Sequence, residues 1–435
     1  MRDIALFILI FGSLPIIIRR PWIGILVWSV LSYANPHRLC YGPAYSFPFA
    51  QLVALTLFAA LIFNRDGFNL PRSGLLLLWA TFMVWMAVTT SAAFFPDQAL
   101  NYLERIYKIQ IITLLTIGLI NTRERVFWLV VTIAGSIGFF GVKGGIFTFL
   151  TAGSYRVFGP ADSFIMENNS LALATLMVIP LGLYLAHQSP WKYSRPVLYT
   201  CCVLALLSAI GSQSRGALLA TLAVAGFLAL KSQRKVLFMI ALGFLIPTIF
   251  AFMPQSWHDR MSTIRTYDED GSALGRLNAW HYSINVANDR ITGGGLESWS
   301  YETFAIYAPD PLDMHAAHSI WFSSLGDHGW PGLLMFMGIF GWTWFKLSAV
   351  IRRHKKDDAQ WLNELARMLQ VCLVAYFVGG SFLSLAYFDL PWHFMAIALI
   401  LERESQKICA GKQSPVAANA GQPALEQEFR QPLRT

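Results

Sequence analysis

The sequence predicts an all-α, polytopic membrane protein. Of its 435 residues, 55% are hydrophobic and only 13% are charged, about half the charged fraction of a soluble domain. The apolar residues gather in runs that approach the roughly 20 residues needed to cross a bilayer as a helix. Lys and Arg residues form short clusters between these runs, as a membrane topology requires. These three observations exclude a soluble enzyme.

The apolar runs predict about twelve full transmembrane helices and one uncertain element. The first run follows Arg2 and continues directly into Arg19–Arg20–Pro21. It has no convincing signal-peptide cleavage site, so we expect it to remain as a spanning or re-entrant element. The candidate spans are 4–18, 22–36, 47–63, 73–93, 98–120, 126–150, 168–187, 196–213, 216–230, 236–253, 330–350, 363–386 and 390–401.

The basic clusters predict the orientation. Counting spans places three of them on one side, the cytoplasm: Lys231–Lys235, Arg352–Lys356 and Arg403–Lys412. Smaller basic groups fall on the same side, namely Arg65, Arg72, Arg123, Arg125, Lys192 and Arg195.

The same count of spans places the long polar loop 254–317 outside. Its nine acidic residues and four arginines give it a net charge of −5. Its length, aromatic residues and helical stretches predict a folded cap with a function of its own. The predicted units are a membrane bundle (1–253), a periplasmic cap (254–317), C-terminal transmembrane helices (318–402) and a disordered cytoplasmic tail (403–435).

Charge and cysteine content narrow the possible partners and cofactors. The net charge is +8, but no polar segment has a basic stripe interleaved with aromatic residues, so we expect no nucleic-acid partner. The five cysteines include no CxxC pair, which argues against a disulfide framework or a zinc site. We expect a monomer surrounded by membrane lipids.

Several cations lie at the predicted outer ends of spans, where a charge usually faces a cavity or a partner. Arg215 stands in the turn Ser214–Arg215–Gly216, whose backbone N–H groups suit an anion. Arg105 and Lys108 share one helix face, although Glu104 can pair with Lys108 at a spacing of four. Lys143 precedes two glycines near another outer end, where a snorkelling role is an even alternative.

The cap ends in a pair of histidines, His315 and His318. The pair lacks a third ligand at a convincing spacing, so we expect no metal site. His318 stands where the loop meets the membrane, and we expect His315 to line the entrance or pair with Asp313. Arg276 in the cap is a further candidate anion ligand, followed by the weak motif Gly293–Gly295.

These motifs resemble the O-antigen ligase superfamily over about 155–395. That superfamily includes ligases that join O-antigen to lipid A-core, O-antigen polymerases and bacterial protein O-oligosaccharyltransferases. The segments that carry the resemblance are Ser214–Gly216, Gly275–Trp280 and His318–Gly332. The N-terminal half, with Lys143–Gly145 and Arg156–Pro160, is similar to the exosortase-associated O-glycosylation ligases. Two departures are Ser319, where many members have Asn, and Asp327, where many have Glu.

The resemblance implies a GT-C-like, inverting and metal-independent glycosyltransferase without a cofactor. The implied donor is a glycan on undecaprenyl diphosphate in the bacterial inner membrane, and the implied acceptor is a sugar hydroxyl of lipid A-core. Arg215 and Arg276 suit the diphosphate because guanidinium groups bind phosphate oxygens in pairs, and His318 suits deprotonation of the hydroxyl near pH 7. The candidate substrate-binding residues are Arg105, Lys108, Lys143, Arg156, His315 and Asp389.

Three alternatives stay open at the level of sequence. An O-antigen polymerase or a protein O-oligosaccharyltransferase would share the donor site and differ only in the acceptor. A lipid or glycan transporter belongs to another class, and would usually show repeated halves and charges at mid-membrane. Here the notable charges gather towards one face, which favours catalysis at the membrane surface.

Overall fold

The computed structural model describes residues 1–63, 68–189, 191, 193–231, 235–262, 271–355 and 359–413. Within these ranges the chain forms helices and turns and no strand. Six helices are long and apolar enough to cross a membrane: α4 (Gly74–Ser91), α6 (Arg123–Leu150), α7 (Asn168–Gln188), α8 (Ser194–Gly211), α14 (Ile320–Arg353) and α15 (Gln360–Gly380). The protein is therefore an all-helical, multi-pass membrane protein, as predicted. The count of about twelve spans stays a prediction.

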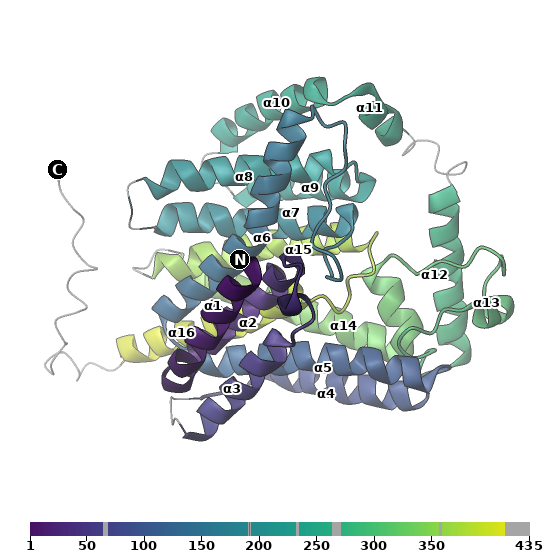
Figure 1. Ribbon diagram of the computed structural model, residues 1–435, viewed down its shortest axis with the longest axis horizontal. Helices are drawn as coiled ribbons and strands as arrows, with labels where there is room; N and C mark the ends of the chain where they lie inside the picture. Colours follow the sequence, from purple (N-terminus) through teal and green to yellow (C-terminus); the bar gives the residue numbers. More distant parts are fainter. Residues whose placement is uncertain are drawn as a thin grey trace, which may run out of the picture.

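Every other predicted span also coincides with a helix. These helices are α1 (Arg2–Arg19), α2 (Pro21–Tyr33), α3 (Phe49–Phe63), α5 (Pro96–Leu119), α9 (Arg215–Lys231), α10 (Lys235–Phe252) and α16 (Asp389–Gln413). Two short 3₁₀ helices, η1 (Pro36–Leu39) and η2 (Pro43–Tyr45), join α2 to α3. Figure 1 shows most of the long helices running side by side in one bundle.

The hydrophobic core runs through the bundle from α1 to α16, and its aromatic centre lies among α14, α15 and α16. Aromatic rings of the last three helices meet there, with ring centroids 5.2 Å apart for Phe340 and Trp392 and 5.5 Å for Phe340 and Tyr376. Such contacts add roughly 0.5–1.5 kcal/mol per pair to the burial of their apolar area. This packed centre fixes the start of α14 relative to the turn between α15 and α16, and both segments border the candidate site.

The two ends of the bundle differ in charge. At one end Arg403 is buried and donates to the carbonyl oxygens of Asn69, Ile117 and Ile120 at 2.8, 3.0 and 2.6 Å. Two of these carbonyls belong to the end of α5, so the arginine satisfies groups that a helix terminus leaves without partners. Arg125 also donates to Leu119 O there, at 2.9 Å. We call this the basal end.

The opposite end carries the cap, which is partly helical as predicted. It contains α11 (Gln255–Ser262), α12 (Gly271–Asp289) and α13 (Tyr301–Tyr307). Figure 1 shows α12 and α13 at the end of the bundle opposite the C-terminal part of α16. The acidic stretch of the cap lies at 263–270, outside the described residues.

The predicted boundary of the tail at residue 403 is too early. Helix α16 continues to Gln413, and the Arg403 contacts described above hold its basal part against α5. The remainder of the predicted tail, 414–435, lies outside the described residues.

Candidate active site

A break in α14 shapes the site. Gly329 has φ 66° and ψ −173°, which interrupts the helix, and Pro331 lacks the N–H that would reach the Asp327 carbonyl. The freed carbonyl oxygens find other donors. Gly326 O accepts from Gly294 N at 2.8 Å, and Asp327 O accepts from Gly295 N at 3.0 Å. The loop of the cap that contains Gly293–Gly295 therefore satisfies the carbonyl oxygens at the break. We call this hydrogen-bonded junction the seal.

That loop contains the triple glycine, and its backbone approaches α14 too closely for side chains. A Cβ on Gly293 would lie 2.6 Å from Gly326 O, and a Cβ on Gly329 would overlap the carbonyl oxygen of Ile291. Gly293 and Gly295 also adopt positive φ values of 66° and 83°, which glycine accepts without steric cost. The glycines therefore have a structural role: they allow the loop to pack against α14, which places residues 297–299 beside the break.

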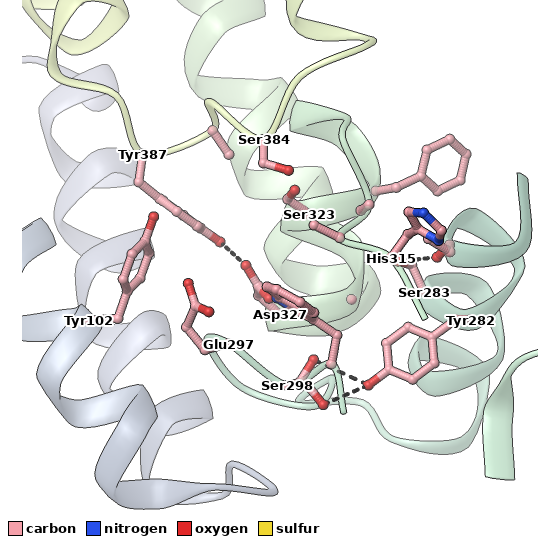
Figure 2. A pocket seen from close by; sticks show the side chains of 17 residues that line it. Tyr102, Tyr282, Ser283, Glu297, Ser298, His315, Ser323, Asp327, Ser384 and Tyr387 are labelled. Atoms are coloured by element: carbon pink, nitrogen blue, oxygen red, sulfur yellow. Dashed lines mark hydrogen bonds between the residues drawn. The ribbon is translucent and has the colours of Figure 1, made fainter. Parts of the chain in front are cut away.

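A cavity of about 90 Å³ lies at this junction. Two carboxylates, Glu297 and Asp327, face it together with the phenol rings of Tyr102 and Tyr387 (Figure 2). Tyr387 donates to Asp327 Oδ2 at 2.8 Å, and burial together with the negative Asp327 raises the pKa of Tyr387 well above its usual value. Burial also raises the pKa of Glu297, an effect that the positive charge of Arg105 partly offsets.

His318 adjoins this cavity, whose wall includes the three residues before it, 315–317. Its backbone adopts φ 43°, and its backbone N–H donates to Oγ of Ser384, a residue of the cavity wall, at 3.1 Å. Burial lowers the pKa of His318, and the positive charges of Arg276 and His315 lower it further, against a smaller opposing effect of Glu167. The imidazole is thus kept neutral near pH 7, the form that accepts a proton.

The structure brings Arg276 and His318 together, since the charge on Arg276 in α12 acts on the imidazole. Arg215 begins α9 at the same end of the molecule. A Cβ on the neighbouring Gly216 would lie 3.3 Å from the Cβ of Phe382, two residues before the serine that holds His318. The structure therefore places Arg276 near His318, and for Arg215 it shows that the start of α9 lies beside the turn that precedes α16.

Three other predicted residues also lie at this end. His315 Nδ1 is 2.9 Å from Asp313 Oδ1, the pairing considered from the sequence, and His315 lines the cavity. Arg105 lies over the ring of Phe164, with its Cζ 4.1 Å from the ring centroid. Lys108 forms an exposed ion pair with Glu104 at 2.6 Å, the structural alternative that its spacing allowed.

Of all the predicted site residues, His315 alone lines this cavity, and the three remaining candidates lie elsewhere. Lys143 lines a separate, mainly apolar cavity with Arg2 and Cys40. Arg156 is exposed on the segment between α6 and α7. Asp389 is buried at the start of α16, where its carboxylate accepts a hydrogen bond from Ser32 of α2.

Part of the chain that forms this site resembles a known protein family. Residues 200–337 match the model of a family described as O-antigen ligase. This match, over about a third of the chain, supports the O-antigen ligase superfamily. Residues 1–190 match a second model, that of a family of unknown function, and no curated protein matched the chain. The ligase match spans Arg215, Arg276 and His318, and also Glu297 and Asp327.

Sequence reasoning missed part of the candidate site. Glu297 and Tyr387 carry no distinctive motif, and they become neighbours of Asp327 only through the sealed break in α14. Asp327 belongs to the motif that starts at His318, but the sequence analysis noted it only as a departure from the Glu of many family members and assigned it no role. The one signal that could have pointed to Glu297 is its position two residues after the glycine run Gly293–Gly295.

Proposed function

We propose that this protein is an O-antigen ligase that transfers a glycan from undecaprenyl diphosphate to a sugar hydroxyl of lipid A-core. The family match supports a ligase or polymerase type of reaction. The observation that carries the finer proposal is the placement of a neutral histidine, His318, within the field of Arg276 and beside a cavity that opens under the cap.

In this proposal the acceptor hydroxyl attacks the anomeric carbon of the donor as His318 takes its proton. The diphosphate leaves from the opposite face, so the anomeric configuration inverts. Arg215 and Arg276 bind the phosphate oxygens and stabilise the charge that develops there. Loss of one preorganised group of this kind typically costs about 3–4 kcal/mol of transition-state stabilisation.

The basic residues support an inner-membrane location with the active site facing the periplasm. Arg125, Arg352 and Arg403 lie towards the basal end, and positively charged loops favour the cytoplasm. The cap end, where donor and acceptor would meet, then faces outward.

A reconstituted reaction tests the proposal. The purified protein would be given a lipid-linked glycan together with lipid A-core, a second lipid-linked glycan, or a peptide containing serine and threonine. We expect transfer to lipid A-core, with anomeric inversion seen by NMR of the product. Transfer only to lipid-linked glycan would identify a polymerase, and transfer only to peptide a protein ligase. Movement of glycolipid across vesicles without any transfer would instead identify a transporter.

A chelator arm tests the metal-free mechanism. We expect turnover without an added divalent metal, because the two arginines supply the charge that would stabilise the leaving group. Three consecutive acids, Asp268–Glu269–Asp270, have the oxygen ligands that divalent cations prefer, and they lie outside the described residues. Activity that collapses with EDTA and returns with Mg²⁺ or Mn²⁺ would contradict the metal-free step.

A further inference from the structure

The cavity beside His318 has walls from both the cap and the bundle. The cap contributes α12, the segment 297–299 and the segment 315–317, and the bundle contributes α5, the first turns of α14 and the turn before α16. Because these elements converge from distant parts of the chain, the cavity is a product of the whole fold and not of one loop.

Glu297 is the polar group that the structure leaves available to a ligand. Within the described part of the chain its carboxylate makes no hydrogen bond or ion pair, and Arg105 acts on it only through space. Its backbone lies in the left-handed region, with φ 57°, a conformation that costs about 1–3 kcal/mol for a residue other than glycine. Figure 2 shows its carboxylate between Tyr102 and Asp327, facing the cavity.

The rest of the wall suits a sugar. Serine hydroxyls at 283, 323 and 384 and the acceptor oxygens of Asp327 can exchange hydrogen bonds with ring hydroxyls. The indole of Trp299 is exposed at the cavity and offers an apolar surface to the C–H face of a ring. A carboxylate that accepts from a hydroxyl makes a bond roughly twice as strong as a neutral pair.

Charge decides which substrate occupies the cavity. The described residues that line the cavity include no arginine or lysine, so the donor's diphosphate belongs on the side of Arg276, which acts on His318 from outside the cavity wall. The group that the base deprotonates is the acceptor hydroxyl, which must therefore lie on the remaining side. We propose that this cavity is the subsite for the acceptor's terminal sugar, an unphosphorylated ring whose hydroxyls bind Glu297 and Asp327 and whose face stacks on Trp299. This inference rests on the proposed function.

Steady-state kinetics with Glu297→Gln and Trp299→Ala test the subsite. With donor saturating, we expect the KM for the lipid A-core acceptor to rise about tenfold or more for Glu297→Gln, while the KM for donor stays within about twofold. Trp299→Ala should raise the same constant, and its exposed position makes misfolding a poor explanation. The matched control is Glu302→Gln, an exposed acid of α13, which should leave both constants unchanged.

The outcomes separate this inference from the proposed function. If the wild-type protein transfers no glycan to any acceptor, the proposed function fails. If the wild type transfers to a sugar acceptor but both variants keep its acceptor KM, or raise the KM for donor equally, the subsite assignment alone is overturned. Transfer by the wild type only to peptide would also overturn it, because the cavity would then bind no sugar acceptor.

Discussion

The imidazole of His318 stands on an unusual backbone. Its φ of 43° lies in the left-handed region, where asparagine is more at ease than most residues. His318→Asn therefore removes the base without adding backbone strain. We expect this variant to fold and bind donor but to lose about 10²–10⁴ in turnover, measured by single-turnover transfer. His281→Asn, an exposed histidine of α12, is the control. Near-normal turnover in His318→Asn would remove the base role.

The neighbouring cation should tune the pH profile of the reaction. His318 has a pKa lowered from 6.5, so kcat/KM should fall on the acid side only below that pH, as the base becomes protonated. Arg276→Gln removes a positive charge, which raises the pKa of His318 and moves the acid limb to higher pH. Arg276→Lys keeps the charge and should leave the limb in place, although it lowers activity because an ammonium lacks the planar fork. Identical acid limbs in the two variants would refute this coupling.

At the scale of elements, the seal between the glycine loop and α14 should be sensitive to one methyl group. In Gly329→Ala the new Cβ overlaps the Ile291 carbonyl, and alanine must also adopt φ 66°. We expect a clear fall in melting temperature together with loss of transfer. The control lies on the same helix, since a Cβ on Gly341 meets nothing within 4 Å. Gly341→Ala should be neutral or slightly stabilising. Equal melting curves for the two variants would mean that the seal contributes little.

The helices themselves were largely predictable from sequence. Apolar runs mark elements such as α4 and α8 because lipid-facing and core-facing positions are both hydrophobic. The start of α14 was not predicted, since Gly326, Asp327 and Gly329 look like loop residues, yet the helix begins at Ile320. Its first turns hold together because the cap supplies the missing hydrogen-bond donors, which no local pattern of residues reveals.

The candidate site was predictable only in part, for the same reason. A cation or a histidine at the edge of an apolar run is conspicuous, which is how Arg215 and His318 were predicted, whereas Arg276 was predicted from the motif Gly275–Trp280 in the cap. A carboxylate within a polar loop is not conspicuous. Glu297 becomes informative only when tertiary structure places it beside Asp327 in a confined space.

For the whole molecule, the asymmetry of charge predicts the topology. In a background without the five native cysteines, Glu302→Cys would report on the cap and Arg353→Cys on the basal end. We expect a membrane-impermeant thiol reagent to label Glu302→Cys in cells whose inner membrane is intact, and Arg353→Cys only after that membrane is broken. Labelling in the reverse order would place the cap in the cytoplasm.

The seal on α14 has a consequence for how such a site can diverge. The loop is attached through main-chain atoms of Gly294 and Gly295, so its grip does not depend on the side chains that follow. Glu297 and Trp299 can then be exchanged while the anchoring bonds persist. With the acceptor subsite proposed above, substitutions at these two positions would change the preferred sugar while the membrane helices stay as they are. The main-chain anchor at Gly294 and Gly295 can thus stay unchanged while the side chains at positions 297 and 299 vary.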